Sequence, residues 1–418
     1  MVYVINKQGQ ALMPTERFGK VRRLLKNSLA HVVCRIPFTI QLDYDTTDNT
    51  QPVSLGVDAG SKHIGISATT SEKELYAADV ELRNDIVDKL STRRELRRTR
   101  RNRLRYRKAR FNNRVSSKCK GWLAPSVENK IQTHLTIVEK IHKFLPITNI
   151  VVETAAFDIQ KINNPSISGS EYQQGEQLDF FNVREYVLFR DNHICQHCKG
   201  KSKDKVLNVH HIESRKTGSD SPKNLITLCE TCHKAYHRGE FKLNVKRGKS
   251  FRDAAFMGIM RWSFYDRLKN IYPNVSMTFG YITKNTRITN NLPKEHYVDA
   301  RCISGNPTAK PLGYYFYQKK VRCQNRQIHK ANFLKGGRKK LNQAPFLVKG
   351  FRLFDLVEYK KDLYYIFGRR SNGSFDIRKL DGTKVNKGSI NCKYLRLIVT
   401  RKSILIEKRT QGAISPIN

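Results

Sequence analysis

Two Cys-x2-Cys motifs, at 195–198 and 229–232, impose a local fold on the middle of this 418-residue chain. A disulfide framework does not place its partners two residues apart in a reducing compartment, whereas paired Cys-x2-Cys knuckles are typical of zinc sites. The thiolates of Cys195, Cys198, Cys229 and Cys232 can close a tetrahedral Zn²⁺ site that ties two loops together without doing chemistry. The spacing therefore predicts a small module built around a structural zinc ion.

Histidines stand between and after the cysteine pairs in an ordered spacing. His210 and His211 end a predicted strand, and His233 and His237 lie four apart on one face of a predicted helix. One strand histidine and two helix histidines can hold one divalent ion, while His211, on the other side of the strand end, can deprotonate water. Asn224 can hold the loop and orient His211 by a hydrogen bond. The alternative is a plain zinc finger with surface histidines. The ordered series of five elements, Cys-x2-Cys, His-His, Asn, Cys-x2-Cys-His and His, argues against it.

Four further residues predict a second site. Asp58 ends the apolar strand VSLGVD, Glu153 ends the apolar strand NIVVE, and His296 and Asp299 lie one turn apart on a predicted helix. Phosphodiester cleavage with two Mg²⁺ ions needs several anionic oxygens around ions ~3.5–4 Å apart. Each acid alone reads as a solvated turn residue, but together and in this order they suit an RNase H-like sheet.

The charge of the chain points to nucleic acid. Lys and Arg number 78 against 36 Asp and Glu, a net charge of +42 that a polyanion must neutralise. Between Arg93 and Arg114 stand twelve basic residues and one acid, Glu95, without Gly or Pro. A solvated basic helix is the bland alternative, and we favour a helix that lies along RNA or a duplex. The arginines expected to contact nucleic acid are Arg93, Arg94, Arg97, Arg98, Arg100, Arg101, Arg103, Arg105, Arg107 and Arg110.

The rest of the chain predicts an α/β protein of several domains. Residues 1–52 read as two strands around a basic helix, residues 53–82 as strands, and residues 126–145 as a helix. Helices are expected over 250–272, then a strand hairpin over 275–289, and a small β domain from about 305. The chain shows neither an apolar run of the ~18 residues that a membrane span needs nor an apolar core of signal-peptide length, so a cytoplasmic protein without membrane partners is expected.

These motifs carry two resemblances. Residues 181–240 resemble the HNH, or ββα-metal, nucleases, which implies that His211 is the general base, Asn224 the orienting residue, and His210, His233 and His237 the Mg²⁺ ligands. The acids resemble the RuvC nuclease site, which implies that Asp58, Glu153 and Asp299 hold two Mg²⁺ ions beside His296. An HNH module inserted in a split RuvC core, with an Arg-rich helix, resembles the transposon-encoded IscB family, related to the CRISPR type II effectors.

Three other stretches support the resemblance to the IscB family. The family's PLMP motif appears here as ALMP at 11–14, with Ala11 in place of the first proline, and VRRLLKNSLAHVVCRIPFTIQL and GVDAGSKHIGIS are similar as well. The implied fold is a RuvC core split in three, with an inserted HNH domain, an Arg-rich bridge helix and small end domains. The implied divisions are a PLMP domain (1–52), RuvC segment I (53–90), bridge helix (91–115), RuvC segment II with linker (116–180), HNH domain (181–245), RuvC segment III (246–304) and a C-terminal β-rich domain (305–418).

The resemblance implies an RNA-guided double-strand DNA endonuclease of the prokaryotic cytoplasm. A guide and scaffold RNA, the family's omega RNA, would pair with one DNA strand, which the HNH site cuts while the RuvC site cuts the displaced strand. The C-terminal domain would read a target-adjacent motif in the double-stranded DNA, and the protein would act as a monomer in a ribonucleoprotein. Two alternatives stay open: a protein-guided HNH endonuclease of restriction or homing type, and an RNA-binding transposon accessory that does not use its catalytic residues.

Overall fold

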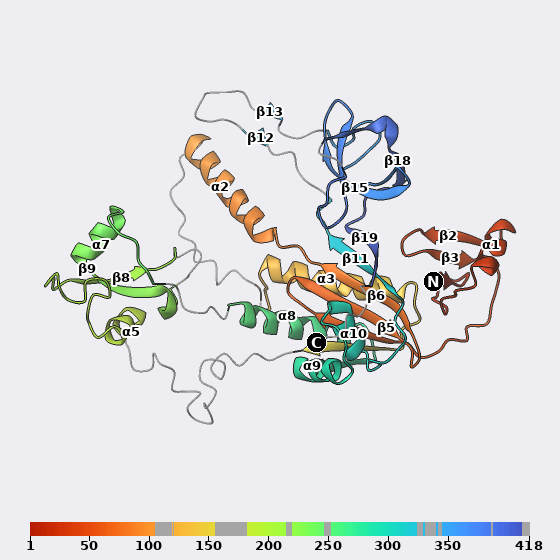
Figure 1. The fold of residues 1–418 in the computed structure, drawn as a ribbon, viewed down its shortest axis with the longest axis horizontal. Helices are drawn as coiled ribbons and strands as arrows, with labels where there is room; N and C mark the ends of the chain where they lie inside the picture. Colours follow the sequence, from red (N-terminus) through yellow and green to blue (C-terminus); the bar gives the residue numbers. More distant parts are fainter. Residues whose placement is uncertain are drawn as a thin grey trace. The chain divides into compact units, whose positions relative to one another are not determined.

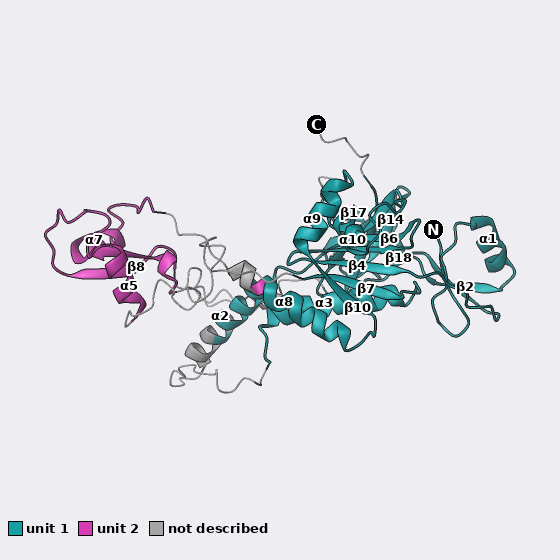
Figure 2. Cartoon of the chain, turned by 90° about the horizontal axis from the view of Figure 1, so that it is seen from below, with its two compact units in different colours: residues 1–155, 257–418 teal, residues 156–256 magenta. Residues whose placement is uncertain are grey.

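The computed structural model describes residues 1–104, 119, 121–154, 182–214, 220–245, 252–323, 329–330, 340–341, 345–385 and 388–411. It divides into two compact units, Met1–Ala155 with Met257–Asn418, and Ala156–Phe256 (Figure 2). Both units mix helices and strands, which confirms the predicted α/β class. Within the described part of the chain, no helix combines the length and apolarity that a bilayer crossing requires.

The first unit is built on one large sheet, to which seven of the described strands belong (Figure 1). In spatial order they are β10 (Val275–Phe279), β7 (Asn149–Thr154), β4 (Ser54–Ala59), β5 (His63–Thr69), β6 (Glu74–Glu81), β11 (Tyr314–Lys320) and β19 (Ile404–Thr410). Strands β10, β7 and β4 run parallel, whereas β4, β5 and β6 form an antiparallel meander. The predicted strands that end in Asp58 and Glu153 are therefore neighbours.

Helix α10 (His296–Ile303) packs directly on the backbone of β4 and β5. Two glycines permit this approach, because a Cβ at Gly56 would lie 1.9 Å from the carbonyl oxygen of Ala300, and one at Gly65 would lie 1.9 Å from that of His296. Because side chains alternate between the two faces of a sheet, Leu55 points to the face opposite Gly56. There α3 (Pro125–His142) and α8 (Arg252–Lys269) lie (Figure 2).

Covering both faces explains why the strands of this sheet carry long apolar runs: β5 and β6 are buried along nearly their whole length. Helix α3 contributes Ile131, Ile137 and Ile141 to the core, and α8 contributes Met260, Phe264 and Leu268 at helical spacing. Helix α2 (Ile86–Leu104) follows β6 and contacts α3.

The N-terminal part of this unit holds a three-stranded sheet. Strand β1 (Tyr3–Ile5) runs parallel to β3 (Thr39–Leu42), which pairs antiparallel with β2 (Ala30–Cys34). Helix α1 (Phe18–Lys26) buries Val21 against this sheet. Residues 30–42, which the sequence predicts as one strand, form two strands, and a cis Ile36–Pro37 bond lies between them.

The C-terminal part contains a second, five-stranded sheet, and its strands lie between residues 356 and 399. They are β17 (Ile390–Asn391), β16 (Ser374–Arg378), β15 (Asp362–Arg369), β14 (Leu356–Tyr359) and β18 (Arg396–Val399), with a 3-10 turn η4 (Cys392–Tyr394). Short strands β12 (His329–Lys330) and β13 (Lys340–Leu341) pair with each other. The sequence places everything beyond residue 305 in one β domain, whereas β11 and β19 complete the large sheet.

The strand hairpin predicted over 275–289 is wrong. Only β10 forms there, and Gly280–Thr289 is a helix, α9. The reason is tertiary: β10 pairs with β7, and the helix that follows lets Gly280 pass close to Glu153, where an added Cβ would lie 3.2 Å from Oε1. Local β propensity gives way to this contact.

The second unit is small and centred on a two-stranded sheet. Strand β8 (Leu207–His211) pairs antiparallel with β9 (Leu225–Cys229), between helices α5 (Val183–Arg190) and α7 (Glu230–His237). A 3-10 turn, η2 (Pro222–Asn224), precedes β9. The predicted linker over 160–180 lies outside the described residues.

Candidate active sites

The carboxylate site lies at the carboxyl ends of β4 and β7 in the large sheet. Because β4 and β7 are parallel and Val57 pairs with Val152, the next residues, Asp58 and Glu153, lie side by side at the ends of their strands. Helix α10 brings His296 to the same place, since its Nδ1 lies 2.9 Å from Asp58 Oδ2. Residues far apart in the sequence are thus brought together by strand register.

Each acid of this site is paired with a cation. His296 contacts Asp58, Arg261 Nη2 lies 2.9 Å from Glu153 Oε1, and Arg287 Nε lies 2.8 Å from Asp299 Oδ1. The contact between Arg287 and Asp299 is an ion pair whose geometry is not that of a hydrogen bond, and neither of these two atoms has a hydrogen-bond partner. The sequence patterns did not reveal the two arginines, which lie on α8 and α9 and carry no motif.

The acids in this site affect one another. Burial and the nearby charge of Asp58 raise the pKa of Glu153, and the same two causes raise the pKa of Asp299. The hydrogen bond to Asp58, set against burial, raises the pKa of His296. Closely spaced buried carboxylates are costly until cations neutralise them, which suits a site for divalent metal.

The donors fit magnesium by chemistry, since all three are carboxylates. Their spacing is wider than that of the other two clusters: among the described residues, only the cysteine group and the histidine group have all ligand atoms within 4.8 Å. The carboxylates therefore stand around the site, each paired with a cation.

A second histidine extends the site. The ring of His63, on β5, stacks on that of His296 with centroids 5.2 Å apart and planes 4° from parallel. Asp79, on β6, holds His63 Nδ1 at 2.9 Å. His63 lies five residues after Asp58, at the start of β5, and the antiparallel return of this strand places it beside His296.

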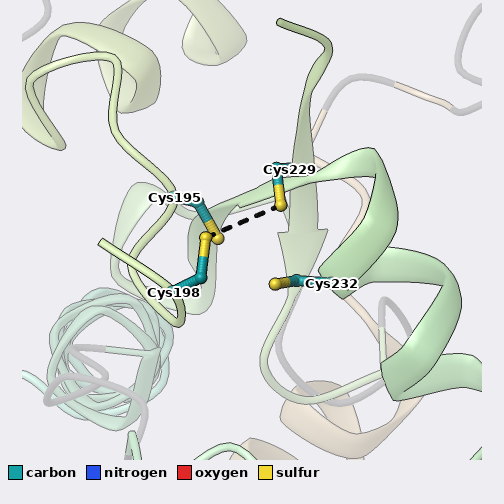
Figure 3. A group of neighbouring side chains, drawn as sticks. All are labelled: Cys195, Cys198, Cys229 and Cys232. Atoms are coloured by element: carbon teal, nitrogen blue, oxygen red, sulfur yellow. Dashed lines mark hydrogen bonds between the residues drawn. The ribbon is translucent and has the colours of Figure 1, made fainter. Parts of the chain in front are cut away.

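The four cysteines converge in the second unit (Figure 3). Cys195 and Cys198 come from the loop after α5, Cys229 from the end of β9 and Cys232 from the first turn of α7. Their sulfur atoms lie within 4.8 Å of one another, with 3.8 Å between Cys198 and Cys229. Four sulfur donors at these positions fit a tetrahedral zinc site.

The environment of Cys198 favours its thiolate. Burial alone would raise its pKa, but hydrogen bonds from the hydroxyl and backbone of Ser202 outweigh that effect and lower the pKa to about 6. The Ser202 hydroxyl lies 3.3 Å from Cys198 Sγ and 3.1 Å from Cys229 Sγ. A thiolate is the form that zinc requires.

Three histidines form a separate cluster beside the cysteines. His210 on β8 faces His233 and His237 on α7, with one ring nitrogen from each within 4.8 Å of the others. Nε2 of His210 is buried and has no hydrogen-bond partner in the structure. Burial, with the charges of His233 and His237, lowers the pKa of His210 to about 4. A buried, neutral and unpartnered imidazole nitrogen fits a metal ligand.

His211 lies apart from that cluster, as the strand alternation predicts. Its Nε2 lies 2.9 Å from Asp220 Oδ1, a partner that the sequence patterns did not indicate. Asn224 is fully buried, accepts a hydrogen bond from the Glu213 amide at 2.9 Å and donates one to the Glu213 carbonyl at 3.0 Å. Asn224 therefore fastens the loop that follows His211.

The basic stretch is a helix as far as it is described, since α2 continues to Leu104. Arg93, Arg94 and Arg97 are exposed. Helix α2 contains the backbone of Arg98, Arg100, Arg101 and Arg103, and the predicted contacts at Arg105, Arg107 and Arg110 lie outside the described residues. The side chains of these three exposed arginines form a basic surface on α2.

Comparison with known proteins gives two family matches. Residues 2–175 match the RRXRR protein family, whose name the chain spells as RRTRR at 97–101, and residues 195–239 match the HNH endonuclease family. The second match defines the class: the chain carries an endonuclease domain of the HNH type. The RRXRR match precedes it in the same chain, and together the two matches support a nuclease related to IscB and Cas9.

Individual relatives share only parts of the chain. Anaredoxin of Nostoc sp. (strain PCC 7120 / SAG 25.82 / UTEX 2576) is 44% identical over 41 residues, which are 10% of this chain and 54% of that protein. Crystal structures of Streptococcus thermophilus Cas9 with the AGAA and AGGA PAM are 16% and 15% identical, each with a TM-score of 0.33. They cover 55% and 50% of this chain, which spans only 31% and 30% of theirs.

Proposed function

We propose that this protein is an RNA-guided endonuclease that cuts both strands of DNA. One observation carries the proposal: a single chain holds a carboxylate site in one unit and a histidine site in the other, next to a zinc-type cysteine cluster. Two sites of different ligand chemistry suit two different strand cuts. In this proposal the large sheet is a RuvC core split in three, with an HNH domain inserted between its second and third segments.

In the carboxylate site, Asp58, Glu153 and Asp299 would hold two Mg²⁺ ions, which supply Lewis acidity and lower the pKa of bound water. The protein's own contribution is orientation and proton transfer. Asp58 fixes His296 at Nδ1, which leaves Nε2 of the same ring to take a proton from the attacking water or give one to the leaving oxygen. The stacked ring of His63 restrains the plane of His296. This site would cut the displaced strand.

In the histidine site, His210, His233 and His237 would hold one Mg²⁺ ion against the target phosphate. His211 would take the proton from the attacking water, and the Asp220 carboxylate would orient the imidazole and stabilise its charged form. The cysteines would hold structural Zn²⁺ and take no part in chemistry. This site would cut the strand that pairs with the guide.

The charge supports RNA as a permanent partner. A compact protein module buries only ~600–1,000 Å² on DNA, enough to read a few base pairs. The surplus of 42 positive charges exceeds what such a short footprint neutralises. A guide and scaffold RNA of the omega type, lying on the bridge helix, would neutralise the charge and supply the base pairing, while the C-terminal sheet reads the adjacent motif. The particle would be a monomer with its RNA in the prokaryotic cytoplasm.

RNA dependence is tested with the purified protein. We expect a high 260/280 absorbance ratio that persists in moderate salt, and we expect a new guide segment to redirect cleavage to the matching DNA. Replacing Arg97, Arg98, Arg100, Arg101 and Arg105 by Ala should abolish RNA retention and guided cleavage together. If RNA-free protein cuts one fixed DNA sequence equally well, the restriction-type alternative holds.

The two sites are tested separately on a supercoiled plasmid. Asp58→Ala and His211→Ala should each leave an enzyme that nicks, and the nicks should map to opposite strands. The double variant should bind DNA and leave it intact. If it does not bind DNA, circular dichroism of each single variant and of the double variant shows whether the protein is folded. Linear product from either single variant would contradict two independent sites.

A further inference from the structure

We infer that Arg261 is a built-in cation of the carboxylate site that competes with divalent metal. Its guanidinium neutralises Glu153 and Asp58 in the metal-free protein, and the contact to Glu153 is given up when metal binds. Arg261 then sets the metal concentration that the site requires. This inference rests on the proposed metal chemistry of the same site and adds a residue that regulates it.

The position of Arg261 is built by the fold. The residue is only 8% exposed although it carries a charge, and it lies on the buried stretch of α8 between Met260 and Phe264. Its Nε donates to the carbonyl oxygen of Ala59, the last residue of β4, at 2.8 Å. That bond aims the guanidinium at the strand ends, where the acids are.

The guanidinium contacts both strand-end acids. Nη2 lies 2.9 Å from Glu153 Oε1 and 3.8 Å from Asp58 Oδ1. A metal ion that uses one oxygen of each acid must occupy the space between them, and the fork of Arg261 reaches into that space. Positive charges repel strongly in a partly buried site, so arginine and metal cannot both be close to Glu153.

The other cations are placed differently. Arg287 pairs with Asp299 from α9, and His296 pairs with the other oxygen of Asp58 from α10. Arg261 alone of the site's three cations contacts two of the acids. Removing its charge leaves Asp58 and Glu153 repelling each other, which destabilises the metal-free protein and increases its attraction for a divalent cation.

The test compares full-length variants by Mn²⁺ titration, with the melting temperature and electron paramagnetic resonance of free Mn²⁺ as readouts. All proteins carry His233→Ala, so that the histidine cluster is incomplete. Arg261→Met should melt lower than the parent in EDTA, reach half-saturation at about tenfold less Mn²⁺, and regain its stability at saturation, where tenfold corresponds to 1.4 kcal/mol.

The matched control is Arg267→Met, six residues further along the same helix. Arg267 makes a two-pronged ion pair with Glu128 on α3, away from the acids, so its loss should lower the melting temperature equally at every Mn²⁺ concentration. Arg261→Lys keeps the charge but not the fork and should titrate between the parent and Arg261→Met. If Arg261→Met does not fold, the titration of Arg261→Lys decides whether Arg261 competes with the metal.

An unchanged or higher Mn²⁺ midpoint in Arg261→Met, or in Arg261→Lys if only that variant folds, would overturn the inference. Asp58→Ala separates this outcome from failure of the proposed function. If Asp58→Ala no longer responds to Mn²⁺ while the arginine variants titrate as the parent does, the acids bind metal without competition from Arg261. If Asp58→Ala titrates like the parent, the metal does not bind at these acids, and the proposed function of the site fails as well.

Discussion

The two candidate centres are assembled in opposite ways. The cysteine and histidine clusters come from one continuous stretch, Cys195 to His237, and within each cluster the ligand atoms already lie within 4.8 Å of one another. The carboxylate site draws on residues from Asp58 to Asp299 and depends on the register of parallel strands and on one helix packed over them. The first centre is a local structure, and the second is a product of the whole unit.

Charge differs between the centres as well. Burial lowers the pKa of His210 and of His233, and His210 Nε2 has no partner, so the cluster can accept an ion without displacing a cation. In the carboxylate site every acid already has a cation. We therefore expect the local centre to fail when its metal is removed, and the dispersed centre to fail when its packing is disturbed.

The largest effect is expected from loss of zinc. A structural zinc ion contributes on the order of 10 kcal/mol to folding of a small domain, so Cys198→Ser should unfold the second unit while the large sheet stays folded. Limited proteolysis should then cut within 182–245, whereas the control Cys323→Ser should protect that region as the parent does. Elemental analysis of the parent should show about one zinc per chain. A zinc-free parent with a protease-resistant second unit would show that the cysteines are not a zinc site.

Disturbing the packing of the dispersed centre should have the next largest effect. Gly65→Ala places a Cβ where 1.9 Å separates it from the His296 carbonyl oxygen, so α10 must move away from β5. We expect a loss of about 3 kcal/mol from the first unit and failure of displaced-strand cutting, with paired-strand cutting retained.

The control for this change is Gly19→Ala in α1, where an added Cβ meets nothing within 4 Å. It should leave stability unchanged or slightly raised. Displaced-strand cutting that survives Gly65→Ala at the parent's rate would show that α10 does not position the carboxylate site.

The same contrast explains what the sequence could predict. Cys-x2-Cys spacing and histidines four apart report local geometry, so the cysteine and histidine clusters could be located from the sequence, with the strand and helix that carry them. The acids could be proposed because each ends an apolar strand. The cations that pair with them could not, since Arg261 and Arg287 lie among many other arginines, and only the folded unit selects these two.

Errors in the fold prediction have the same origin. Residues 280–289 were expected to be a strand, yet they form α9, which brings Gly280 close to Glu153 and Arg287 to Asp299. Strands β11 and β19 were assigned to the C-terminal domain, although they pair with β6 and with each other in the large sheet. Long-range pairing leaves no local signal in a short apolar strand.

Acid probes the packing beneath the dispersed centre independently of metal. His134, on α3, is fully enclosed against Phe264, and burial lowers its pKa to about 4. The unfolded chain takes up this proton near pH 6.5, so the stabilisation is complete above that pH and is lost as pH falls toward 4. The loss should total roughly 3 kcal/mol in the first unit.

His134→Phe should flatten this dependence when urea unfolding is followed between pH 7 and 4. A residual slope is expected from His142, whose pKa burial also lowers to about 4. His31→Phe, at an exposed position, serves as the control and should unfold with the parent's slope. The same slope in His134→Phe as in the parent would mean that other groups govern the acid sensitivity.

The smallest effect concerns Asn224 and asks what holds His211, the proposed general base of the histidine site. Asn224 both accepts from and donates to the backbone of Glu213, two residues after His211. Asn224→Asp keeps the shape but cannot donate, so a carboxylate oxygen would face the Glu213 carbonyl oxygen. We expect about 2 kcal/mol of destabilisation in the second unit, the usual cost of a buried group left without its partner. Paired-strand cutting should fall in parallel, because the loop that follows His211 loosens.

Asn208→Asp, at a half-buried position on the same sheet, is the matched control and should change both the stability of the second unit and paired-strand cutting little. If cutting falls while the melting temperature of the second unit stays constant, Asn224 acts on His211 directly and does not merely fasten the loop.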